Sequence, residues 1–162
     1  LRQPTASDLR LVLTVIKTTA DLERIGDEAK RVARMAIRAA SVDHGRNLYG
    51  QIAHLGSQVQ QMLHQALDAF ARMDVNAAIH IAHEDVNIDR EYESVMRQSM
   101  TYMMEDPRSI PNILDVMWSA RALERIGDRA RNICEYVIFL VQGKDVRHTA
   151  YVNKSDLDTG LA

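Results

Sequence analysis

The sequence predicts an all-α protein built from four long helices. Aromatic residues make up only 5% of the 162 residues, whereas hydrophobic residues make up 46%. That balance suits packed helices better than sheets. Only three prolines and seven glycines punctuate the chain. Apolar residues recur at steps of three and four over long segments, which is the spacing of one helix face.

The first helix is expected at about residues 7–41, after Pro4 and with Ser7 as its N-cap. Its apolar stripe steps by three and four, and is expected to face a core. This stripe contains Leu22, Ile25, Ala29, Val32 and Ala36. The following segment, SVDHG at 41–45, is predicted to be a turn.

Three further helices are expected at about 46–73, 75–104 and 109–142, with Asp74 capping the second of these and Gly143 ending the last. Their short connections predict an antiparallel three-helix bundle. The side chains expected inside it are Leu55, Val59, Leu63, Ile88, Val95, Ile126, Ile133 and Val137.

The hexapeptide LERIGD occurs twice, at 22–27 and at 123–128, and neighbouring positions match at the same offset. Duplication of a three-helix unit of about 100 residues explains this repeat most simply. The predicted organisation has three parts. Residues 1–44 are the last helix of an incomplete first repeat, 45–143 form a complete second bundle, and 144–162 are a polar tail.

Each copy of the repeat carries two acids four residues apart, Glu23 with Asp27 and Glu124 with Asp128. Like charges at this spacing cost roughly 0.2–0.5 kcal/mol unless something compensates them, and a bridging cation would do so. Each pair is expected on a helix flank within reach of solvent or of another domain. A glycine lies between the acids of each pair and predicts close approach of a neighbouring helix.

A second pair of acids, Asp85 and Asp89, is predicted on the helix at 75–104, where an antiparallel bundle would bring them near Glu124 and Asp128. Carboxylate oxygens favour hard cations over a Cys/His zinc site. Ordinary surface ion pairs explain the same acids without any metal. Lys30 and Arg131, three residues after Asp27 and Asp128, are the cations for that alternative.

Composition narrows the classes of function. A net charge of −2 and a sequence pI near 6.3 argue against a nucleic-acid partner. No apolar run is long enough to predict membrane insertion. The single Cys134 is expected to be buried, and one thiol fits a reducing cytoplasm. No catalytic constellation or organic-cofactor motif is present in the sequence, so a non-enzymatic protein is expected.

The stretches DLERIGDEAKRVARMA and RALERIGDRARNICEYVIFLVQGKDVRH resemble the PhoU family of accessory regulators of bacterial phosphate transport. The resemblance implies six helices in two three-helix bundles, of which this chain would hold the last four. It implies a negative regulator of the phosphate-starvation response. Its expected partners are the phosphate ABC transporter ATPase and the phosphate-sensing histidine kinase.

The resemblance also implies a metal site. Some relatives hold iron or zinc clusters on their E/D-x-x-x-D motifs, which map onto Glu23, Asp27, Glu124 and Asp128. Divalent or trivalent ions on carboxylates are therefore the expected cofactors. Two alternatives stay open at this point, a metal-free helical adaptor and a ferritin-like di-iron enzyme. The second is weakened because the sequence has no Glu-x-x-His motif.

The first helix is expected to need a packing partner, because no other helix of its own repeat is present in this sequence to cover its long apolar stripe. An exposed stripe of this length favours association. Either a second copy of the chain or helices outside these 162 residues should cover it. A homodimer is the expected assembly.

Overall fold

The computed structural model describes residues 5–39 and 46–143, and it confirms the all-α prediction. The predicted turn at 41–45 and the tail at 144–162 lie outside the described residues. The helices are α1 (Ala6–Ala39), α2 (Arg46–Arg72), α3 (Val75–Glu105) and α4 (Ile110–Gln142), with a 3-10 turn at Pro107–Ser109 before α4. None of these helices is long and apolar enough to cross a membrane.

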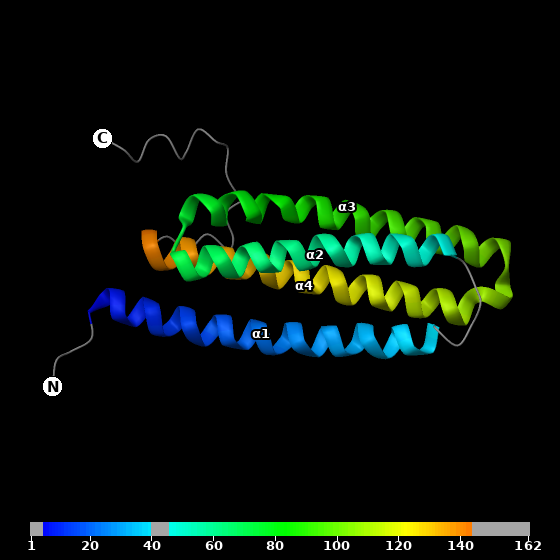
Figure 1. Ribbon diagram of the computed structural model, residues 1–162, viewed down its shortest axis with the longest axis horizontal. Helices are drawn as coiled ribbons and strands as arrows, with labels where there is room; N and C mark the ends of the chain where they lie inside the picture. Colours follow the sequence, from blue (N-terminus) through cyan, green and yellow to red (C-terminus); the bar gives the residue numbers. More distant parts are fainter. Residues whose placement is uncertain (1–4, 40–45, 144–162) are drawn as a thin grey trace.

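Helix α4 is the centre of the molecule. Consecutive helices α2, α3 and α4 run antiparallel, as expected, and α1 lies along the other side of α4 (Figure 1). Within the described part of the chain, α4 packs against all three other helices, whereas α1 packs against α4 alone. The small residues Ala120 and Ala130 are fully buried on α4 and allow this close packing on several sides.

The core of the three-helix bundle follows the predicted apolar faces. Leu63 differs, because it is only half-buried at the edge of α2, whereas its neighbour Met62 is 2% exposed. Leu63 still packs against the core as a partly buried residue. The predicted core residues that are buried are Leu55, Val59, Ile88, Val95, Ile126, Ile133 and Val137.

Local signals set the helix ends. Asp74 caps α3 by accepting a hydrogen bond from the backbone N–H of Ala77 at 3.0 Å. Gly143 follows α4 with a left-handed φ of 70°, a conformation that glycine adopts without strain. Both predictions for these ends are confirmed.

The start of α1 differs from the prediction. Thr5 and Asp8 form a reciprocal cap, in which each side chain accepts a hydrogen bond from the other residue's backbone N–H, at 3.3 and 2.9 Å. This is the capping-box arrangement, and it satisfies two backbone donors at once. The helix therefore begins at Ala6, one residue before the predicted cap Ser7.

Helix α1 meets α4 with a polar stripe and not with the predicted apolar one. Of the predicted stripe, Ile25 is buried and Val32 is half-buried, whereas Leu22, Ala29 and Ala36 are exposed. The reason is that acids on α1 pair with arginines on α4, which rotates α1 about its axis. The residues buried on α1 are Thr14, Thr18, Asp21, Ile25, Glu28 and Met35.

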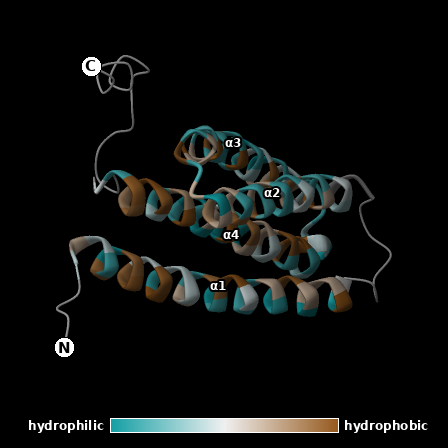
Figure 2. Ribbon diagram, turned by 60° about the vertical axis from the view of Figure 1, so that its left-hand side comes forward, coloured by the Kyte–Doolittle hydropathy of each residue, from teal (hydrophilic) through white to brown (hydrophobic). Residues whose placement is uncertain are grey.

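Large apolar side chains are exposed along the N-terminal half of α1. The ribbon of this half carries several strongly hydrophobic residues (Figure 2). Leu11 is 44% exposed and Val15 is 47% exposed. The other exposed apolar residues in this half are Leu9, Val12, Leu13, Ile16 and Leu22. The chain shown here supplies no cover for them within its described residues.

Candidate functional site

The second LERIGD copy lies where α4 crosses closest to α3. A Cβ placed on Gly127 would be 3.2 Å from Cγ2 of Ile88 and 3.5 Å from Oδ1 of Asp85. The predicted close approach is therefore confirmed at Gly127. It is not found at Gly26 of the first copy, where a Cβ would meet nothing within 4 Å.

Asp85 is the buried acid of this region, and it is 3% exposed. Its carboxylate accepts a hydrogen bond from Arg131, whose guanidinium also lies 3.3 Å from Oδ1 of Asp128. Burial raises the pKa of Asp85, the neighbouring Asp89 and Asp128 charges raise it further, and Arg131 opposes both effects. Arg131 also lies 3.7 Å from Oε1 of Glu135, so one arginine partly neutralises three carboxylates.

The carboxylate of Glu124 is only partly compensated. Its Oε1 accepts a hydrogen bond from Arg121 at 2.8 Å, but its Oε2 is buried and has no hydrogen-bond partner. Burial, followed by the charge of Asp128, raises its pKa. The side chain of Glu124 is only 12% exposed, so it is less open to solvent than predicted, whereas the side chain of Asp128 is 42% exposed.

Four of the six candidate metal ligands lie on α3 and α4, close enough for electrostatic interactions between them. The charges of Asp89 on α3 and Asp128 on α4 raise the pKa of both Asp85 and Glu124. The remaining two, Glu23 and Asp27, lie exposed on α1. Asp27 forms a 3.2 Å ion pair with Lys30, as the alternative without metal expects.

The donor chemistry on α3 and α4 fits a hard cation. Every candidate donor is a carboxylate oxygen, and the orphaned Oε2 of Glu124 is a buried acceptor that a cation would satisfy. In the present arrangement Arg121 and Arg131 supply the positive charge. Across residues 5–39 and 46–143, no three His, Cys, Asp or Glu side chains are already grouped so that they hold an ion.

A second polar cluster joins α1 to α4, and sequence reasoning missed it. Asp21 accepts hydrogen bonds from Arg129 at 2.9 Å and from the hydroxyl of Tyr136 at 2.8 Å. Glu28 accepts one from Arg125 at 3.2 Å. The available signal was the stripe of polar residues on α1 that steps by four and three, parallel to the apolar stripe.

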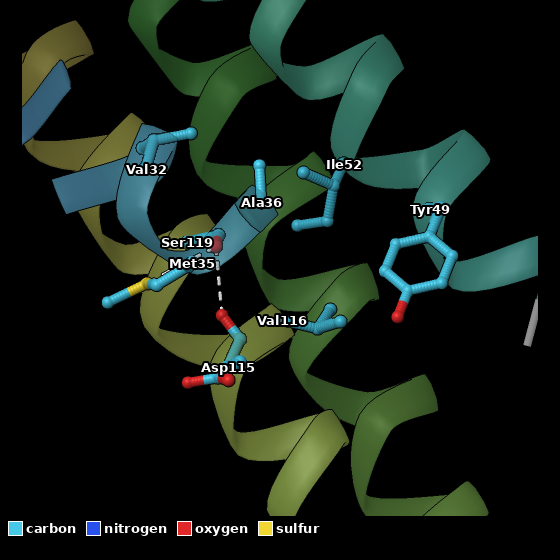
Figure 3. Close-up of a pocket in the computed structure, with 8 residues that line it drawn as sticks. All are labelled: Val32, Met35, Ala36, Tyr49, Ile52, Asp115, Val116 and Ser119. Atoms are coloured by element: carbon cyan, nitrogen blue, oxygen red, sulfur yellow. Dashed lines mark hydrogen bonds between the residues drawn. The ribbon is translucent and has the colours of Figure 1, made fainter. Parts of the chain in front are cut away.

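A pocket of about 260 Å³ is lined by the end of α1 and by the first turns of α2 and α4 (Figure 3). Its walls are largely apolar, and its carboxylate, Asp115, is held by Arg38 at 2.6 and 3.1 Å. Ser119 donates a hydrogen bond to the backbone carbonyl of Asp115 (Figure 3). The lining residues are Val32, Met35, Ala36, Tyr49, Ile52, Asp115, Val116 and Ser119.

Cys134 is buried on α4, as predicted. Burial, with a smaller contribution from the charge of Glu135, raises its pKa to about 12. A thiol with this pKa is protonated at neutral pH, and the thiolate is the reactive form. Cys134 therefore behaves as a small apolar core residue.

These features define a helical-bundle protein in which a carboxylate-bearing helix is duplicated. The family model of the PhoU domain matches residues 1–36 and 52–137, and the chain belongs to the PhoU family. The resemblance in the two LERIGD helices is thereby confirmed.

Named relatives are closely similar. The phosphate-specific transport system accessory protein PhoU of Escherichia coli is 52% identical over 161 residues, which cover 99% of this chain and 65% of that protein. A PhoU homolog of Pseudomonas aeruginosa is 54% identical over 147 residues, covering 91% of this chain and 61% of the relative. The chain therefore spans about three fifths of these relatives' length.

The fold is also that of a solved relative. The crystal structure of PhoU from Pseudomonas aeruginosa superposes with a TM-score of 0.85 at 53% sequence identity. The superposition covers 89% of this chain and 69% of the crystallised one.

Proposed function

We propose that this protein is a non-enzymatic negative regulator of the phosphate-starvation response that works in phosphate homeostasis. The observation that carries the proposal is the 52% identity to a phosphate-specific transport accessory protein across 99% of the chain. The matched region covers all four helices. Membership of the PhoU family also favours this function over a ferritin-like di-iron enzyme.

The regulator is proposed to act in the cytoplasm by linking two proteins, the phosphate ABC transporter ATPase and the phosphate-sensing histidine kinase. A rigid bundle with long polar helix faces suits contact with partners better than chemistry on a bound substrate. Co-purification of the full protein with each proposed partner in separate experiments tests this link. Retention of both partners is expected. Retention of neither would overturn the proposed link.

A carboxylate metal site is proposed as a second property. Iron, zinc or another divalent or trivalent ion would be held by Glu124 and Asp128, with Asp85 and Asp89 as helpers. The supporting observation is the buried Oε2 of Glu124, which has no hydrogen-bond partner. A bound ion would supply positive charge between α3 and α4 and so tie these helices together.

Self-association through α1 is proposed as well. Seven large apolar side chains are at least 39% exposed in its N-terminal half. Burying one such side chain contributes about 1.5–3 kcal/mol, so covering several is strongly favourable. We expect light scattering to give the mass of a homodimer for the full protein. A monomer at micromolar concentration would contradict this assembly.

A further inference from the structure

Helix α4 has an open strip between α1 and α3. Leu114, Trp118, Arg121 and Arg125 follow one another at steps of four, three and four, so they share one side of the helix. Helices α1 and α3 flank α4 on opposite sides (Figure 1). Trp118 is 56% exposed and Leu114 is 42% exposed, although large aromatic side chains usually find cover in a monomer.

Arginines of α1 and α4 lie beside this strip. Asp21 lies between Arg24 of α1, at 3.9 Å, and Arg129 of α4, at 2.9 Å. The Asp21 side chain is 4% exposed, whereas that of Arg24 is 64% exposed. Asp21 is therefore covered, whereas the guanidinium group of Arg24 is exposed to solvent.

The same arrangement recurs one heptad further along α1. Glu28 lies between Arg31, at 3.0 Å, and Arg125 of α4, at 3.2 Å. The Glu28 side chain is 12% exposed, while Arg31 is 48% and Arg125 is 42% exposed. Each buried acid is shared by two arginines, so each group leaves one positive charge uncompensated at the surface.

A cation–π contact lies near each end of this surface, and at one end Arg121 shares its charge with Glu124, which accepts its hydrogen bond at 2.8 Å. Lys17 of α1 lies 5.8 Å from the ring centre of Tyr136, and Arg121 lies 5.8 Å from that of Tyr92 on α3. The whole chain is acidic, with a net charge of −2, so this positive surface is a local feature. We name it the arginine–tryptophan face and define it by Trp118, Arg121, Arg125, Arg24 and Arg31.

We propose that the arginine–tryptophan face docks an acidic protein segment that carries a large apolar side chain. Arginine and tryptophan are the residues most enriched at interface hot spots. Arg24 and Arg31 are separated by two helical turns, about 10 Å, which matches carboxylates spaced along an acidic helix. The guanidinium group of arginine binds a carboxylate through two parallel hydrogen bonds. Trp118 and Leu114 require an apolar group on the ligand, and free phosphate has none. This docking function goes beyond the proposed regulation and does not depend on it.

The test measures fluorescence anisotropy of short synthetic helical peptides labelled with fluorescein and titrated with the full protein. The first peptide carries glutamates at helical spacing and two leucines on the same face. A second has lysine in place of every glutamate, and a third has serine in place of both leucines. Binding of the first peptide alone is expected. No binding of the first, or equal binding of all three, would overturn the proposal.

Matched variants localise the binding. Arg125→Gln and Trp118→Ala should each weaken the first peptide roughly tenfold, the effect of losing one charge-assisted contact or one buried anchor. Arg125→Gln leaves Glu28 paired with Arg31, and circular dichroism confirms that each variant is folded. Arg72→Gln at the end of α2 and Met104→Ala at the end of α3 remove an exposed charge and an exposed apolar group elsewhere, and should change nothing.

Competition experiments distinguish binding of the acidic peptide from binding of other anionic ligands. Inorganic phosphate and vesicles of an anionic phospholipid are added to the complex of protein and first peptide. Neither is expected to displace the peptide at physiological ionic strength. Displacement by the vesicles that requires Trp118 would assign the face to a membrane surface and overturn the peptide proposal. Equal weakening by Arg72→Gln and Arg125→Gln would also overturn it, because binding would then follow overall charge alone.

Discussion

Arg129 of α4 donates a 2.9 Å hydrogen bond to Asp21 of α1, which lies 108 positions earlier in the chain. The Asp21 side chain is 4% exposed, and it also accepts a hydrogen bond from Tyr136. This buried pair holds α1 on α4 in a register that apolar patterning does not specify.

Removal of Asp21 should weaken the contact between α1 and α4. Asp21→Ala leaves Arg129 without its buried partner, which typically costs about 3 kcal/mol. Asp27→Ala is the matched control, because Asp27 is exposed and its ion pair with Lys30 contributes less than about 1 kcal/mol. Urea denaturation measures both variants. Equal loss of stability in the two would contradict the role of Asp21.

The two glycines of the repeat should respond differently to alanine. Gly26→Ala introduces a Cβ into open space and should stabilise α1 by about 1 kcal/mol through helix propensity. Gly127→Ala places a Cβ 3.2 Å from Ile88, and overpacking of this kind costs about 1–3 kcal/mol. The free energy of unfolding should therefore be lower for Gly127→Ala than for Gly26→Ala. The reverse order would show that α3 yields easily at this contact.

The helices and the bundle core could be predicted from sequence because their signals are local. Pro107 and Gly143 mark the start and the end of the last helix, Asp74 caps α3, and steps of three and four identify the buried faces. Leu63 was placed inside because it follows this pattern, but it lies at the boundary of the buried face, where periodicity does not resolve exposure.

The face of α1 could not be predicted in the same way. Its apolar stripe and its polar stripe have the same period, and only the positions of Arg125 and Arg129 decide which one faces α4. The candidate metal residues show a similar limit. Sequence spacing pairs Glu124 with Asp128, but it does not show that the Glu124 side chain is 12% exposed whereas that of Asp128 is 42% exposed.

Metal content should depend on the α4 acids. We expect protein purified without added metal to contain iron, zinc or another divalent or trivalent cation, and Glu124→Gln/Asp128→Asn to lose it, because these residues supply the proposed oxygen ligands. The equivalent change in the first copy, Glu23→Gln/Asp27→Asn, should retain more metal, since those acids are exposed on α1. Elemental analysis by mass spectrometry measures all three proteins. Equal content in the wild type and the α4 variant would refute the site, and a metal-free wild type would favour a metal-free adaptor.

The thiol of Cys134 should make stability depend on alkaline pH. Its pKa is raised from 9.0 to about 12 in the folded protein, so the unfolded chain releases the thiol proton first. This contribution to stability is present below pH 9.0 and is lost as the pH rises toward 12. Urea midpoints at several pH values should show the wild type losing its advantage over Cys134→Ala above pH 9.0. A constant difference between the two proteins across that range would contradict the raised pKa.

The most direct test of the proposed regulation is the expression of a phosphate-responsive reporter gene in a strain that lacks the whole gene for this protein. In phosphate-rich medium the deletion strain should express the reporter as strongly as a phosphate-starved wild type, because the signal that represses it is lost. Restoring the full gene should return expression to the repressed level. Expression that stays low in phosphate-rich medium and still rises on starvation in the deletion strain would contradict the proposed negative regulation.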